Sequence, residues 1–206
     1  MQMKTLLSPA ERKIFERLTT PQKIQDYLDT LPYNFEPDGE TYMSPRRTIR
    51  AKVAHCFEGA LFAAAALAYH GHKPLLLDLN TTHGDDDHLV ALFKYGSYWG
   101  AISKTNHAIL RYRDPVYTSV RELAMSYFHE YYLLDGRKTL RSFSVPLNIS
   151  KYKLDSWLTA EEDLIWLADA LTDAKHTPVA PPDHIRALRR ATSFEIVALD
   201  STEWQE

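Results

Sequence analysis

The segment AHCFEGALFAAAALAY, residues 54–69, decides how this chain of 206 residues is interpreted. Its alanine-rich composition predicts a helix, and Gly71 predicts where that helix ends. Cys56 lies at the start of the helix and is the only cysteine in the chain. The N–H groups and the dipole of a helix N-terminus lower the pKa of a thiol, which favours a nucleophile. The alternative is a small, buried, apolar side chain that begins a core helix.

Short strands are predicted after this helix, at KPLLLDL (73–79), HLVALFKY (88–95), YWGAISKT (98–105) and HAILRYRD (107–114). The second and third of these strands should form a hairpin, because Gly96-Ser97 is a good two-residue turn. The polar segment NTTHGDDD (80–87) is expected to be the loop that precedes the hairpin.

Helical periodicity flanks the strands on both sides. Helices are predicted at 8–18 and 20–31, each after a capping residue, at 119–132, and at 163–171 after a capping box of Thr159 and Glu162. The segment from Pro32 to Pro45 is expected to be a long loop, TPVAPPD (177–183) a linker, and FEIVAL (194–199) a last strand.

Helices first, antiparallel strands in the middle and helices after them predict an α+β fold. The length predicts a single domain over residues 1–206. Within it we expect N-terminal helices and a loop in 1–53, a catalytic-like core in 54–117, and a helical C-terminal part in 118–206 with a linker near 176–183. No feature of the sequence indicates an oligomeric state.

Composition and charge exclude several classes of protein. With 45% hydrophobic residues the chain can bury a sizeable core, and a net charge of -3 gives no reason to expect nucleic acid or an anionic membrane as partner. One cysteine excludes an internal disulfide framework. The N-terminal segment lacks the apolar stretch of a secretory signal, and the apolar run Phe57–Tyr69 is too short to span a bilayer. We therefore expect a cytoplasmic protein without a cofactor.

The order of Cys56, helix and strand, with His88 beginning the next strand, resembles the core of the transglutaminase-like superfamily. In that family a nucleophilic cysteine, a histidine and an aspartate occur in this order on a papain-like scaffold. The resemblance covers about residues 54–105: HCFEGALFAAAALAYHGHKPLLLDL is similar to the cysteine segment of the family, and DHLVALFKYGSYWGAIS to its histidine hairpin. It implies an α+β fold of the transglutaminase-like, papain-like type, with Cys56 as nucleophile and His88 as base.

Ser103 occupies the position at which this family carries its aspartate. If the hairpin has a two-residue turn, His88 lies opposite Thr105 and Ser103 is its diagonal neighbour on the same face. Asn106 falls on the other face unless a bulge shifts the register, but an amide oxygen could also hold the imidazole tautomer. Asp114, the nearest carboxylate downstream, should lie at the far end of the hairpin. We rank Ser103 and Asn106 above Asp114 as the residue that orients the ring.

The predicted function is thiol acyl chemistry on an amide or peptide bond of a peptide, a protein or a small amide. Cys56 attacks, His88 carries the proton, and Ser103 or Asn106 orients the ring. The oxyanion hole would use the Cys56 N–H and a second donor, for which the His55 ring is one candidate. Members of the family include both hydrolases and acyltransferases.

Two other classes of function remain open. A non-catalytic binding module on the same fold is favoured by the missing aspartate. A metal hydrolase built around His83 and His88 is the third hypothesis, although the same segment fits a solvated acidic loop. Arg46, Arg47 and Arg50 could bind an acidic substrate or form a solvated basic turn. The helical spacing of four aromatic residues predicts core positions, at Tyr127, Phe128, Tyr131 and Tyr132.

Overall fold

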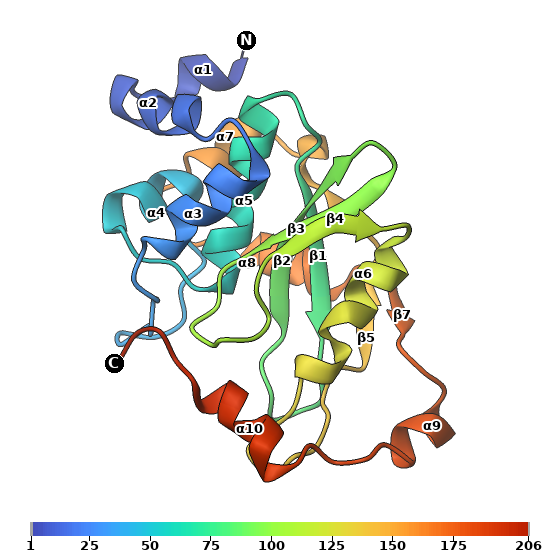
Figure 1. The fold of residues 1–206 in the computed structure, drawn as a ribbon. Helices are drawn as coiled ribbons and strands as arrows, with labels where there is room; N and C mark the ends of the chain where they lie inside the picture. The colour runs from blue at the N-terminus through green and yellow to red at the C-terminus, as the bar shows by residue number, and fades with distance from the viewer. Residues whose placement is uncertain (1, 206) are drawn as a thin grey trace.

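An antiparallel sheet lies at the centre of the structure, with helices on both of its faces (Figure 1). The computed structural model describes residues 2–205, and it has an α+β fold. The strands are β1 (Leu75–Asn80), β2 (His88–Tyr95), β3 (Tyr98–Ser103), β4 (Arg113–Tyr117), β5 (Ser142–Ser144), β6 (Leu147–Asn148) and β7 (His176–Pro178). Their order is β4-β3-β2-β1-β5-β7, and β6 also pairs with β1.

Helices flank β1–β4 on both sides along the chain. They are α1 (Gln2–Leu6), α2 (Pro9–Arg17), α3 (Pro21–Asp29), α4 (Pro45–Ala51), α5 (Cys56–Tyr69), α6 (Val120–Tyr127), α7 (Leu154–Leu158), α8 (Ile165–Thr172), α9 (Pro182–Arg186) and α10 (Ser193–Asp200). Two 3₁₀ turns lie at Phe128–Glu130 and Ile149–Lys151. No helix within residues 2–205 is long and apolar enough to cross a membrane.

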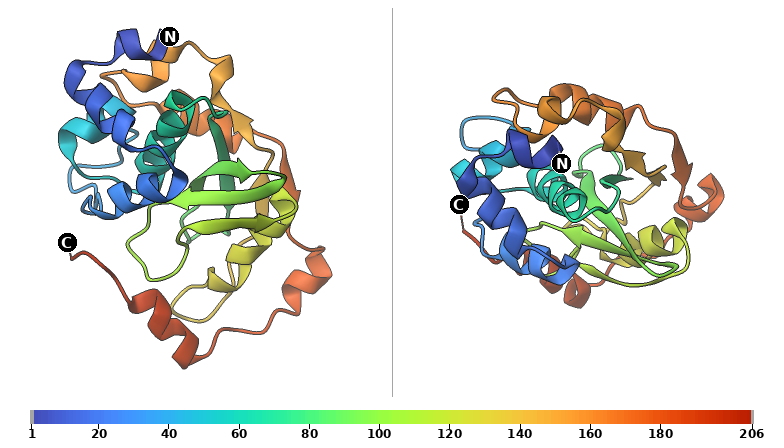
Figure 2. Two further views of the ribbon diagram at one scale, coloured as in Figure 1. Left: turned by 45° about the horizontal axis from the view of Figure 1, so that its top comes forward. Right: turned by 90° about the horizontal axis from the view of Figure 1, so that it is seen from above.

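The two faces of the sheet bury different side chains because successive residues of a strand point in opposite directions. One face packs on α5 through Leu76, Leu89, Ala91, Phe93 and Ile102. The other packs on α6 through Leu77, Leu79, Val90, Leu92 and Ala101. Seen from above, α5 lies between the N-terminal helices and the sheet (Figure 2). This position makes α5 the central helix of the larger core.

The predicted hairpin is confirmed. Tyr95 pairs with Tyr98 across a two-residue turn in which Gly96 has a φ of 60°, and Val90 pairs with Ser103. This register places His88 opposite Thr105, as expected from the sequence. The predicted third strand, however, begins later than expected, at Arg113.

Residues 107–112 form a loop where the sequence pattern predicts a strand. At Leu110 the backbone adopts a φ of 60°, in the left-handed region, which an extended strand does not contain. Its N–H donates to Glu130 Oε2 at 2.7 Å, and its carbonyl accepts a hydrogen bond from Ser103 Oγ at 2.5 Å. The N–H and the carbonyl of Leu110 therefore hydrogen-bond to side chains, whereas in a strand they would pair with a neighbouring strand.

Several predictions outside the core need correction. The segment 194–199 is helical, not a strand, because Thr192 and Glu195 form a capping box and start α10. Thr159 follows α7 as its C-terminal cap rather than capping the next helix, and α8 begins only at Ile165. The expected linker at 177–183 contains the end of β7 and the start of α9. The capped helices at the N-terminus are confirmed, with Ser8 and Thr20 as their caps.

Candidate active site

Cys56 is the first residue of α5 and is half-buried. Its Sγ lies 3.9 Å from the backbone oxygen of Asp87, the residue before β2. The helix start is held by His55, whose Nδ1 accepts from Phe57 N–H at 3.0 Å, and by the buried Glu58, which accepts from His55 N–H at 2.9 Å. The backbone N–H of Cys56 has no acceptor within its own helix, as in the first turn of any helix. The sequence therefore places this thiol at a helix N-terminus, as predicted.

His88 begins β2 and points to the α6 side of the sheet, whereas α5 covers the other side. Its ring centroid is 6.4 Å from that of Tyr127 in α6. The thiol and the ring nevertheless line one cavity, and each belongs to the first residue of its element. The His88 ring is also one of the groups that lower the pKa of the Cys56 thiol.

The environment of Cys56 favours the thiolate. Burial alone would raise the pKa of the thiol, but the neighbouring His55 and His88 rings lower the pKa of Cys56 to about 5. The ordinary value of a cysteine pKa is about 8.5. At neutral pH the thiol is therefore ionised, which is the form that attacks a carbonyl carbon.

Ser103 hydrogen-bonds to one nitrogen of the His88 ring. The distance from His88 Nε2 to Ser103 Oγ is 2.7 Å, and the same hydroxyl donates its hydrogen to the Leu110 carbonyl at 2.5 Å. Because that hydrogen is committed to Leu110, the hydroxyl must accept from the ring, and Nε2 carries a hydrogen. In the neutral ring Nδ1 is then the nitrogen left to accept a proton.

A second layer of contacts fixes Leu110. Its N–H donates to Glu130, and Glu130 Oε2 forms an ion pair of 2.6 Å with Arg113 Nη2. The carbonyl that receives the Ser103 hydrogen is thus held by a charged pair on β4 and the 3₁₀ turn. The orientation of the His88 ring therefore depends on this whole series of contacts and not on the Ser103 side chain alone.

The other two candidates for orienting the ring are engaged elsewhere. The Asn106 side chain accepts from Trp204 N–H at 2.8 Å and donates to the Trp204 carbonyl at 3.1 Å. Its amide therefore secures the C-terminal segment. Asp114 is exposed on β4. Of the three residues, only Ser103 contacts His88 within the part of the chain that the structure describes.

His55 serves mainly as the cap of α5. Its Nε2 is 3.0 Å from the Thr41 carbonyl and 3.1 Å from Glu36 Oε1. Burial would lower the pKa of His55, but hydrogen bonding to Cys56 and the charges of Cys56, Glu58 and Glu36 raise the pKa to about 10. A protonated Nδ1 could no longer accept from Phe57, so the cap opposes that rise. With both ring nitrogens engaged, His55 is a poor oxyanion donor.

The metal hypothesis has no support in the geometry. His83 is exposed in the loop before β2, while His88 is buried and bonded to Ser103. Over residues 2–205, no group of three His, Cys, Asp or Glu side chains is arranged to hold a metal ion.

The three arginines of α4 have structural partners. Arg46 pairs with Glu11, Arg47 with Asp163 and Arg50 with Glu161, at N–O distances of 2.8, 2.7 and 2.6 Å. They connect α4 to α2 and to the loop after α7, so a role in binding an acidic substrate is not needed to explain them.

Two cavities meet at Cys56. The first has a volume of about 120 Å³ and is lined by both Cys56 and His88, with Tyr131, Lys104 and Leu199 among its other walls. The second has a volume of about 310 Å³. It lies on the His55 side of the thiol and is lined by carboxylates from three segments, at Glu36, Glu40, Asp78, Asp86 and Asp87. An extended ligand could therefore pass over the thiol from one cavity to the other.

Tyr131 is the residue of this site that the sequence analysis assigned only to the core. Its side chain is buried, with 3% of its surface exposed, and it lines the cavity shared by Cys56 and His88. The helical spacing of the aromatic residues gave no sign that this hydroxyl would reach the site, because the chain leaves α6 and turns at the 3₁₀ segment before Tyr131.

Comparison with known proteins adds no assignment: no model of a protein family matches the chain, and no curated protein matches it.

Proposed function

We propose that this protein is a thiol-dependent acyl-transfer enzyme or hydrolase of the transglutaminase-like type, acting on an amide or peptide bond. The observation that carries the proposal is the hydrogen-bonded series His88, Ser103 and Leu110 beside a thiol whose pKa is lowered to about 5. The arrangement of elements also supports a papain-like fold. The thiol begins α5, α5 packs on the antiparallel sheet, and the histidine begins strand β2 of that sheet.

The chemistry assigns one role to each of the three residues. The Cys56 thiolate attacks the carbonyl carbon, a C–S bond forms, and the π electron pair moves to the oxygen. When the pair returns, the bond to the leaving group breaks, and His88 gives the leaving group the proton that Nδ1 took from the Cys56 thiol. Ser103 accepts from Nε2 throughout and keeps Nδ1 directed at the reacting atoms. Water or an amine then takes the acyl group from sulfur.

The test is acylation by an activated ester, p-nitrophenyl acetate, followed by intact-mass analysis. The native chain should gain one acetyl group on Cys56, with release of p-nitrophenolate. Cys56→Ser serves as the control, because it keeps the size of the side chain and removes the thiol. His88→Ala should slow acetylation most at about pH 5–6, where loss of the ring leaves less thiolate, and little at about pH 8, because p-nitrophenolate leaves without a proton. Ser103→Ala should slow acetylation less than His88→Ala does.

The binding-module hypothesis makes the opposite prediction. If the native chain is folded by circular dichroism but gains no acetyl group faster than a denatured control, the catalytic proposal is wrong. A folded groove with an unreactive thiol would then favour binding without catalysis.

A further inference from the structure

We propose that the Tyr131 hydroxyl is a catalytic hydrogen-bond donor that stabilises the negative carbonyl oxygen formed when Cys56 attacks, as the second donor of the oxyanion hole. This inference rests on the proposed function and adds a residue to it. The first donor would be the Cys56 N–H at the start of α5.

The position of the hydroxyl is the first argument. The Tyr131 side chain is buried and lines the cavity of about 120 Å³ together with Cys56 and His88, and its Oη is buried. Among residues 2–205, this oxygen has no hydrogen-bond partner. A buried hydroxyl without a partner costs about 1–3 kcal/mol, so such a group in a folded chain calls for an explanation, and beside Cys56 and His88 a bound substrate can supply the partner.

The neighbouring tyrosine gives a useful contrast. Tyr132 lines the same cavity, but its hydroxyl donates to the Glu195 carbonyl at 2.5 Å and so fastens α10. Of these two adjacent tyrosines, only Tyr131 has a hydroxyl without a hydrogen-bond partner among the described residues.

Rigidity is the third argument. The Tyr131 ring belongs to the core on the α6 side of the sheet, with Tyr127, Phe128 and Leu140. Its carbonyl accepts from Thr139 N–H at 3.2 Å. Burial, followed by the charges of Cys56 and Asp85, raises the pKa of Tyr131 well above its ordinary value. The phenol therefore stays protonated and in place, as a preorganised donor must.

The Tyr131 donor affects only reactions in which the thiolate attacks a carbonyl carbon. In attack on an ester, the pair displaced from the C=O bond gathers on oxygen, and Tyr131 O–H donates to it without transferring its proton. In alkylation by iodoacetamide, the thiolate attacks a saturated carbon and iodide leaves, so no oxyanion forms. A single variant can therefore be compared in two reactions of the same thiol.

The experiment uses Tyr131→Phe, with Tyr112→Phe as the matched control. The Tyr112 hydroxyl is also buried and unpartnered within residues 2–205, but it does not line the cavity. We expect Tyr131→Phe to slow acetylation by p-nitrophenyl acetate on the order of 10²-fold. Its alkylation rate and the pH profile of alkylation should match the native chain, and its Tm should be equal or higher, because the variant removes a buried hydroxyl without a partner. Tyr112→Phe should leave both reactions unchanged.

Three results would overturn the proposal. The first is native acetylation in Tyr131→Phe. The second is an equal loss in alkylation and acetylation, which indicates a structural role. The third is a larger loss with phenyl acetate than with p-nitrophenyl acetate, which would place the hydrogen bond on the leaving oxygen. Failure of the native chain to acetylate is a different result, and it rejects the proposed function itself.

Discussion

At the scale of single residues, the serine at position 103 is suited to its surroundings in a way that an aspartate is not. Its hydroxyl donates to the Leu110 carbonyl and accepts from His88 Nε2. A carboxylate can accept from the ring but has no hydrogen for the carbonyl. The chain around Leu110 therefore requires a residue that is both donor and acceptor.

Ser103→Asp should consequently fail to increase the rate of acetylation. The residue is buried, with 1% of its surface exposed, and the new carboxylate would face the Leu110 carbonyl oxygen. We expect a loss of stability of about 1–3 kcal/mol or more and slower acetylation than in the native chain. Thermal unfolding should give the order Ser103, then Ser103→Ala, then Ser103→Asp. An aspartate variant as stable as the native chain and more active would contradict this explanation.

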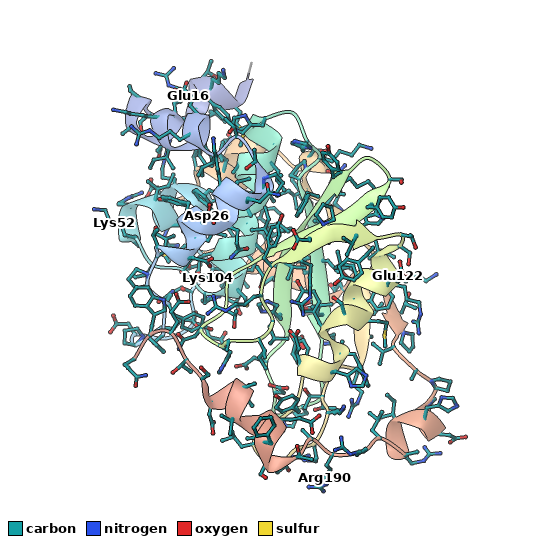
Figure 3. The ribbon with its side chains drawn as sticks, in the orientation of Figure 1. Glu16, Asp26, Lys52, Lys104, Glu122 and Arg190 are labelled. Carbon is teal, nitrogen blue, oxygen red and sulfur yellow. The ribbon has the colours of Figure 1, made fainter. Side chains whose placement is uncertain are left out.

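At the scale of elements, the close approach of α5 to the end of β3 decides how the site is assembled. A Cβ at Gly59 in α5 would lie 2.3 Å from Lys104 Cβ, closer than real side chains approach. Lys104 directly follows β3 and lies near α3 (Figure 3), where its ammonium donates to the Leu31 carbonyl at 2.5 Å. The absence of a side chain at Gly59 therefore lets the thiol helix meet the strand that carries Ser103.

Gly59→Ala tests this contact, because the contact determines whether the substitution raises or lowers the free energy of unfolding. In an exposed helix, replacing glycine by alanine stabilises by about 0.5–1 kcal/mol. Here we expect a loss of about 1–3 kcal/mol, because the backbones of α5 and the Lys104 segment must separate. Urea denaturation measures the free energy of unfolding. A stabilised Gly59→Ala variant would mean that the two segments are not held together as described.

The sequence predicted those parts of the fold that depend on local chemistry. The caps at Ser8 and Thr20, the helix that begins at Cys56 and the hairpin turn at Gly96 are local patterns, and each was located correctly. The apolar residues at 194–199 predicted a strand, but the capping box of Thr192 and Glu195 starts a helix at 193–200.

The same distinction between local and long-range contacts applies to the candidate site. Hairpin register alone brings Ser103 to His88, so that contact could be foreseen. The placement of Tyr131 and Leu110 depends on the turn after α6 and on the left-handed conformation within the loop 107–112. Both arise from contacts between distant segments, for which the sequence contains no periodic signal.

At the scale of the whole molecule, a contact between a buried aspartate and a histidine joins the core sheet to a late strand. Asp78 in β1 contacts His176 in β7, with 3.0 Å between Oδ2 and Nε2. Burial, opposed by the hydrogen bond to His176 and reinforced by the charge of Asp87, raises the pKa of Asp78 from 3.8 to about 6. The carboxylate at neutral pH therefore costs stability, even with its partner.

Asp78→Asn should show this cost as a function of pH. A pKa raised by folding stabilises the folded state fully below the unfolded value near 4, and that stabilisation is lost as pH rises through 6. At pH 8 the neutral amide, which keeps an oxygen for His176, should gain on the order of 2 kcal/mol over the native chain. The gain in Tm should vanish near pH 4. The exposed Asp86→Asn is the control, and a gain that does not depend on pH would refute the assignment.

The most direct measurement of the central claim, an activated Cys56 paired with His88, is the rate of iodoacetamide alkylation between pH 5 and 10, extended downward to pH 4. With one thiol in the chain, no other cysteine contributes to the signal. We predict an inflection near the Cys56 pKa of about 5. His88→Ala should shift it upward by about one pKa unit or more, equivalent to about 1.4 kcal/mol per unit. The shift should stop short of the value of an isolated buried thiol, since His55 and the helix remain, and Ser103→Ala should leave the inflection nearly in place. An inflection near or above pH 8.5 that His88→Ala does not move would contradict the claim.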